Sequence, residues 1–276
     1  MGHPRGVGFV RRHWVLLGIA VIGALVVGAV ATTVLSLDTP GPASVDDAVD
    51  RFRENGGDGG PALPGGRPPE GVYRYEATGQ SALSFPPLTQ HDGAELPATV
   101  THQPRGCWTT RVDFNAEHWQ EWTYCRVGDT MVETRGRSGQ AWDLGVSSAE
   151  NVSTFLCRPP NPVLVPEAEP GDEVEQSCSG RNTAVDGRTT SGGPSTFVGE
   201  ETLVIDGTEV TTFHLHSERT LTGGQEGDES TDAWFRYDGL LVRYERDIEV
   251  GTDSPIGTIT YTEEGHFQLT GLRPQT

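Results

Sequence analysis

Apolar and polar residues alternate with a period of two along most of the chain from Gly71 onward, and turn residues interrupt the alternation about every 8 to 12 positions. Such alternation is typical of β-strands that bury one face. Asp186-Gly187, Asp206-Gly207 and Asp238-Gly239 are two-residue hairpin signals, because a type I′ turn needs positive φ at both central positions. We therefore predict an all-β, mostly antiparallel domain over residues 71–276.

An uncharged apolar run occupies residues 15–37, directly behind Arg11 and Arg12. At about 1.5 Å per residue, a helix over this run would cross a hydrocarbon core about 30 Å thick. Because positive flanks stay in the cytoplasm, we predict one plasma-membrane span, with residues 1–14 inside and the β domain outside the cytoplasm. The alternative is a cleaved signal peptide ending at Ala29-Val30-Ala31. The apolar run continues past that site, which favours an anchor.

Residues 38–70 combine a short helix with a linker. Val45, Ala48, Val49 and Phe52 fall at helical spacing, and Ser44 is suited to be the N-cap, so residues 44–54 are predicted to form an amphipathic helix. The Gly- and Pro-rich stretch that follows is typical of a linker.

Charge narrows the range of partners. All 20 basic residues are Arg and three of them precede residue 38, so the remainder carries 17 Arg against 39 acidic residues, a formal charge of −22. Such a surface repels nucleic acid. We expect no nucleic-acid partner, and instead a membrane through the N-terminal span, an envelope protein or an amphiphilic ligand.

Four cysteines in an extracytoplasmic domain favour two disulfides, for which three connectivities exist. We predict the sequential pairs Cys107–Cys125 and Cys157–Cys178. The second pair encloses five prolines, which forbid a regular ladder inside that loop.

The first pair also predicts a strand register. If Cys107 faces Cys125 in a hairpin, the turn lies at residues 115–117, Trp108 faces Tyr124, and Arg111 faces Glu121. The same register gathers one apolar face, which consists of Trp108, Val112, Phe114, Trp122 and Tyr124.

Candidate chemistry is sparse. His214 and His216 share one face of a strand and form half of a metal site, but no third ligand is indicated. Trp119, on the face opposite the apolar one, is the candidate contact for a ligand or partner. The adjacent Glu263 and Glu264 point to opposite faces of a strand and so do not form a glycosidase pair. No nucleophile elbow, metalloprotease, P-loop or dinucleotide motif occurs, and we predict no cofactor.

Several stretches resemble the LolA-type half-barrel of envelope lipoprotein carriers. They are Gly71-x-Tyr73-x-Tyr75, Val204-Ile205-Asp206-Gly207, and Asp232-Ala233-Trp234 followed by the stretch from Asp238 to Arg243. The chain also resembles uncharacterised single-pass secreted proteins of high-GC Gram-positive bacteria. The resemblance implies a curved antiparallel sheet or half-barrel whose concave face holds a lipid or acyl chain.

These observations favour a non-catalytic, membrane-anchored extracytoplasmic β domain that binds a ligand or an envelope partner. The first alternative is a lipid or amphiphile carrier on the half-barrel. The second is a metal-dependent hydrolase that uses His214 and His216.

Overall fold

The computed structural model describes residues 40–57, 59, 66–143, 148–255 and 257–276. The predicted tail and span at residues 1–37 lie outside the described residues, as does part of the predicted linker. Among the residues that are described, no helix has the length and apolar character needed to cross a membrane. Of the two units into which the chain divides, residues 39–142 and 150–276 form the one that contains the sheet.

Within these residues the chain forms one α-helix and thirteen strands. The helix is α2 (Val45–Glu54). The strands are β1 (Gly71–Leu83), β2 (Leu88–His91), β3 (Glu95–Gln103), β4 (Cys107–Asp113), β5 (His118–Val127), β6 (Thr130–Asp143), β7 (Ser148–Leu164), β8 (Glu173–Asn182), β9 (Thr189–Ile205), β10 (Thr208–Gly223), β11 (Glu226–Phe235), β12 (Leu241–Ser254) and β13 (Gly257–Leu269).

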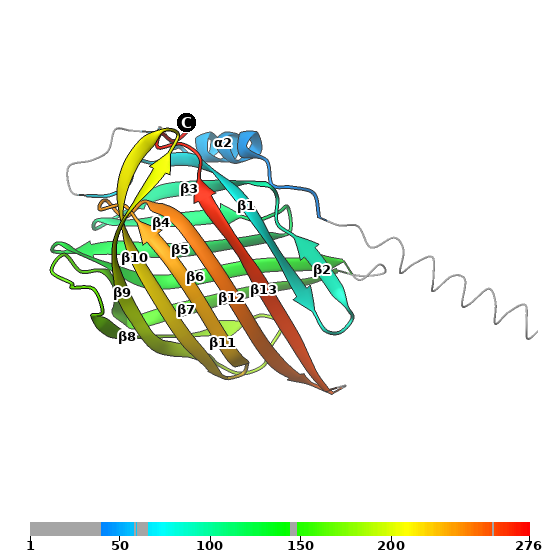
Figure 1. The fold of residues 1–276 in the computed structure, drawn as a ribbon. Coiled ribbons are helices and arrows are strands. Elements are labelled where there is room, and N and C mark those ends of the chain that lie inside the picture. Colours follow the sequence, from blue (N-terminus) through cyan, green and yellow to red (C-terminus); the bar gives the residue numbers. More distant parts are fainter. Residues whose placement is uncertain (1–39, 58, 60–65, 144–147, 256) are drawn as a thin grey trace, which may run out of the picture. The chain divides into compact units, whose positions relative to one another are not determined.

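The strands follow one another in a single antiparallel sheet, and the last strand returns to the first (Figure 1). β13 pairs with β1 from Tyr75↔Leu269 to Leu83↔Tyr261. On its other side, β1 pairs first with β3 and then with the short β2. All strands except β2 therefore form a closed ring. The all-β prediction is confirmed, whereas the expected open half-barrel is wrong, because β1 and β13 satisfy each other's backbone groups along most of their length.

The hairpin of β4 and β5 has the predicted register. Cys107 faces Cys125, Trp108 faces Tyr124, and the series continues to Asp113↔Trp119. The Phe114 N–H donates to the His118 carbonyl at 2.8 Å, which leaves residues 115–117 as the turn. The predicted apolar face is buried in full, and the Cys107–Cys125 disulfide is formed.

The inward faces near the β1–β3 end of the sheet form an apolar core. Tyr75 meets Phe267 edge-on with ring centroids 5.3 Å apart, and Trp122 meets Tyr244 at 5.4 Å. Met131 and aliphatic side chains from β3 and β12 belong to the same buried cluster. Because side chains already fill this end, it is a packed core.

Helix α2 confirms the prediction for residues 44–54. The Ser44 hydroxyl accepts the Asp47 N–H at 3.2 Å as the N-cap. The four predicted apolar residues are buried together with Val72, whose side chain lies on the outward face of β1. The helix thus packs on the outer face of the sheet, beside the C-terminus (Figure 1).

The second predicted disulfide, Cys157–Cys178, joins β7 to β8. The ladder between these strands runs from Ser153↔Asn182 to Cys157↔Cys178 and ends at the disulfide. The prolines that follow Cys157 explain this end, since proline has no N–H to donate. Beyond the disulfide β8 pairs only with β9.

Replacing both Cys107 and Cys125 by Ser is expected to lower the free energy of unfolding by about 3 kcal/mol, because the bridge closes a loop of 18 residues. Both positions are partly exposed, so the serine hydroxyls reach water. Denaturant titration of the variant and the parent chain measures the difference. A loss below about 1 kcal/mol would contradict a stabilising role for this bridge.

Candidate functional site

The interior of the closed sheet is polar away from the apolar core. Alternation places polar side chains from several strands there, and some of them are charged. The buried ones are Gln140 and Glu133 on β6, Gln176 on β8, Arg246 on β12, Glu263 on β13 and His118 on β5. Arg219 on β10 and Glu229 on β11 are partly exposed, and Asp92 accompanies them.

Arg246 is the centre of a buried ion cluster. Its side chain is 1% exposed and contacts Asp92 Oδ2 at 2.8 Å and the Glu263 carboxylate. The guanidinium lies 4.0 Å above the ring of Phe114, and the Tyr261 hydroxyl donates to Glu263 at 2.7 Å. Burial raises the pKa of Asp92 although Arg246 opposes the shift. Burial would also raise the pKa of Glu263, but the charges of Arg246 and His118 and hydrogen bonds from Tyr261 and Arg246 together outweigh it, and the pKa is lowered.

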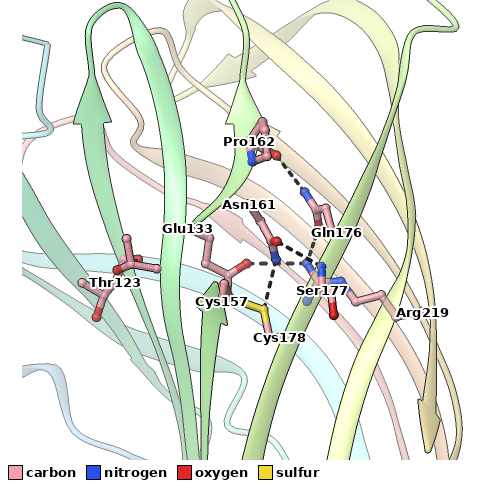
Figure 2. The surroundings of a disulfide bond; sticks show 10 residues. Thr123, Glu133, Cys157, Asn161, Pro162, Gln176, Ser177, Cys178 and Arg219 are labelled. Carbon is pink, nitrogen blue, oxygen red and sulfur yellow. Dashed lines mark hydrogen bonds and ion pairs between the residues drawn. A yellow bond between two sulfur atoms is a disulfide. The ribbon is translucent and has the colours of Figure 1, made fainter. Parts of the chain in front are cut away.

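A second polar group surrounds the Cys157–Cys178 disulfide, which faces the interior (Figure 2). Arg219 Nη2 donates to Gln176 Oε1 at 2.5 Å and lies 3.5 Å from Glu133 Oε2. Asn161 Nδ2 lies 3.0 Å from Cys178 Sγ. Among the described residues, Glu133 and these two cysteines are the one set of three metal-ligating side chains with converging ligand atoms. The sulfurs are consumed by the disulfide, so the set is not a metal site in this state.

Between these two groups lies a cavity of about 170 Å³. Four buried polar atoms on four different strands line it without a hydrogen-bond partner in the described part of the protein. They are His118 Nδ1 on β5, Asn151 Oδ1 on β7, Ser191 Oγ on β9 and Arg219 Nε on β10. Glu133, Glu229 and Glu263 contribute carboxylates to the same wall. The arrangement can hold a small molecule that both donates and accepts hydrogen bonds.

His118 is a titratable wall residue whose environment favours the neutral form. Burial lowers its pKa to about 4, and the charge of Glu263, 3.8 Å from Nε2, only partly opposes that shift. The ring packs against Phe114 with centroids 4.7 Å apart. At neutral pH the imidazole therefore offers one donor and one acceptor.

The predicted pair His214 and His216 lies outside the ring, and Leu215 between them points into the core. Asp232 on β11 contacts both imidazoles, at 2.6 Å from His214 Nε2 and 3.1 Å from His216 Nδ1. The second nitrogen of His214 bonds Glu201 at 2.8 Å. The two histidines therefore belong to a carboxylate network, and their assignment as metal ligands stays a prediction.

Trp119 lies on the outer face, as its register predicts. The guanidinium groups of Arg111 and Arg137 lie 4.2 and 5.3 Å from its ring centroid. The ring is therefore partly covered by the protein's own cations. Its role as a contact residue stays a prediction.

Sequence reasoning missed the interior charges, although a signal for them exists. Arg246 has the same period-two parity as Tyr244 and Val250, so it lies on the apolar face of β12. Arg219 likewise shares its parity with Leu215 and Leu221 on β10. A charged residue at an inward position of a strand is the pattern that marks this site.

The fold and this site define a closed antiparallel β domain with a polar interior cavity. No protein-family model matches the chain, and no curated protein matches it. A comparison with solved structures finds a crystal structure of the hypothetical lipoprotein YmcC from Escherichia coli (K12), which is 13% identical. The match covers 79% of this chain and 95% of that one with a TM-score of 0.31, which is too low to support an inference about function.

Replacing Arg246 by Met is expected to lower the free energy of unfolding by about 3–5 kcal/mol, since it leaves two buried carboxylates without a cation. Arg74→Met is the matched control, because Arg74 pairs with Glu95 on the exposed outer face. The control is expected to change stability by no more than about 1 kcal/mol. Denaturant titration measures both, and equal losses would contradict the structural role of the buried cluster.

The pKa of His118 is expected to lie below the ordinary histidine value of 6.5, and the pKa of His216 above it. NMR should find the pKa of His118 at about 4. It should find that of His216 raised, because hydrogen bonds to Asp232 and Glu218 outweigh the effect of burial.

The two shifts make the stability of the fold depend on pH in opposite directions. The His118 contribution is complete above pH 6.5 and is lost as the pH falls through about 4, because the unfolded chain then binds a proton that the folded chain refuses. The His216 contribution is present below pH 6.5 and is lost as the pH rises through its raised pKa. His118→Gln and His216→Gln assign the signals, and a His118 pKa near 6.5 would contradict the effect of burial on this residue.

Proposed function

We propose that this chain is a non-catalytic binding module that holds a small polar ligand in the interior cavity of its closed sheet. The supporting observation is the convergence of four unpartnered buried polar atoms on one cavity. Buried polar groups are almost always hydrogen-bonded, and an unpaired one costs about 1–3 kcal/mol. A ligand with both donors and acceptors would offset that cost.

The proposed location is outside the cytoplasm, with residues 15–37 as the membrane anchor. Two disulfides support an oxidising compartment. An envelope protein remains a candidate partner for the outer surface. The hydrolase alternative has weaker support, because the ring nitrogens of His214 and His216 are engaged with carboxylates.

A second candidate function is the binding of a short amphiphile. A separate cavity of about 240 Å³ lies beside the connection between β7 and β8 and is lined mainly by apolar side chains. Val163, Phe197, Phe213 and Leu215 are among them. The cavity would hold a short apolar tail rather than a long acyl chain, because the adjoining core is already packed.

The test of the polar site is a ligand screen on the full chain with a variant that fills the cavity. Gly136 lines the cavity, and a Cβ added there would meet only Glu133 Oε1, at 3.4 Å. Thermal-shift and calorimetric screening of small polyols, amino acids, amines and carboxylates is expected to yield a saturable ligand. Gly136→Leu is expected to weaken its binding by about 100-fold or more, because the new side chain occupies its space.

Gly271→Leu is the matched control, because a Cβ at Gly271 meets nothing within 4 Å, and it is expected to retain binding. Short-chain alcohols test the apolar cavity in parallel, and their binding should not respond to Gly136→Leu. If no polar solute binds, or if Gly136→Leu leaves its binding unchanged, the polar-cavity proposal is wrong.

A further inference from the structure

The polar half of the interior contains more negative than positive formal charge. Two arginines face four carboxylates. Arg246 contacts Asp92 and Glu263, and Arg219 contacts Glu133 and interacts with the charge of Glu229. His118 adds no compensating charge at neutral pH, because burial lowers its pKa to about 4. The formal excess is therefore two negative charges, in a place where an unpaired charge is costly.

The excess charge is concentrated at the cavity. Three of the four carboxylates line it, namely Glu133, Glu229 and Glu263, whereas Arg219 is the inward-facing cation on its wall. Arg137 also lines the cavity, but its guanidinium contacts Glu121 and the ring of Trp119 on the outer face. Two almost fully buried polar side chains, His118 and Ser191, direct unpartnered atoms into the same space. The rings of Trp122 and Tyr261 also line it, and aromatic faces attract cations.

We propose that the interior cavity selects a small organic cation, with primary ammonium groups as the class that its carboxylates and acceptors fit best. This inference rests on the proposed binding function. An ammonium group brings three donors and no acceptor, so it can engage two carboxylates and one neutral acceptor together. Among the described residues, these carboxylates do not bring three ligand atoms within 4.8 Å of one another, which disfavours a bare metal ion.

Cation binding at the cavity favours the ionised form of Glu229. Burial raises the pKa of Glu229, Arg219 opposes that shift, and Glu133 and Glu263 add to it. The groups that face Glu229 come from β10, β6 and β13, and Tyr244 faces it from β12. A bound ammonium stabilises the carboxylate and so opposes the raised pKa of Glu229. Affinity for the cation should therefore rise with pH.

The test is a calorimetric titration of the full chain with three probes of similar length and different charge. These are 1,3-diaminopropane, 1,3-propanediol and malonate, at constant ionic strength. We expect saturable binding of the diamine alone. Titrations at several pH values should show that its affinity rises with pH. Glu229→Gln should weaken diamine binding by at least about tenfold and reduce that pH dependence.

Glu226→Gln is the matched control, since Glu226 is an exposed carboxylate on the same strand, and it should bind like the parent chain. Glu133→Gln repeats the test if Glu229→Gln does not fold. If the diol or malonate binds as tightly as the diamine, or if both wall variants bind it like the parent chain, the cation inference is wrong while the cavity remains a binding site. If neither these probes nor the wider screen yields a ligand, the proposed function itself fails.

Discussion

The pairing of β1 with β13 is the constraint on which the rest of the structure depends. The two strands lie at opposite ends of the domain sequence, and the Thr270 hydroxyl donates to a carbonyl 196 positions earlier. Such a contact costs loop-closure entropy, but that cost grows slowly with length and the ring contact of Tyr75 with Phe267 helps to offset it. Closure pairs the two long edges of the sheet and encloses an interior. That interior must be filled by side chains, or its polar groups must find hydrogen-bond partners.

The buried ion cluster stabilises this seam. Asp92 follows β2, Glu263 lies on β13, and both contact Arg246 on β12. The approach of Asp92 requires a glycine on β1, because a Cβ at Gly79 would lie 2.2 Å from Asp92 Oδ2. One guanidinium with five donors therefore connects the segments on both sides of the closing pair. The polar interior is in this respect part of how the sheet closes.

The elements that could be predicted from the sequence are those determined by neighbouring residues. The β4–β5 hairpin follows from two cysteines 18 positions apart, and α2 follows from its apolar spacing and Ser44. Closure could not be predicted, because no local pattern specifies which distant strand β1 pairs with. The alternation along the strand predicts that Glu263 and Glu264 point to opposite faces. Which of the two points inward depends on the pairing of β13 with β12 and β1, which the sequence does not specify.

The site is for the same reason only partly predictable. Parity places Arg219 and Arg246 on inward faces, yet a strand cannot show whether an inward arginine meets a carboxylate, a cavity or water. The residues chosen from sequence, His214, His216 and Trp119, are recognisable because their types are familiar in binding sites. The structure places all three on the outer face and the unpartnered groups inside.

The two halves of the interior make opposite contributions to stability. Around the aromatic rings nearly every side chain is apolar and packed, which is the arrangement that favours folding. Around the cavity, excess carboxylates and unpartnered atoms oppose folding, and an apolar filling would be more stable. Natural proteins depart from such local rules mainly where function requires it. The packed end can therefore support the costly polar end, and the proposed ligand would supply the partners that the polar end lacks.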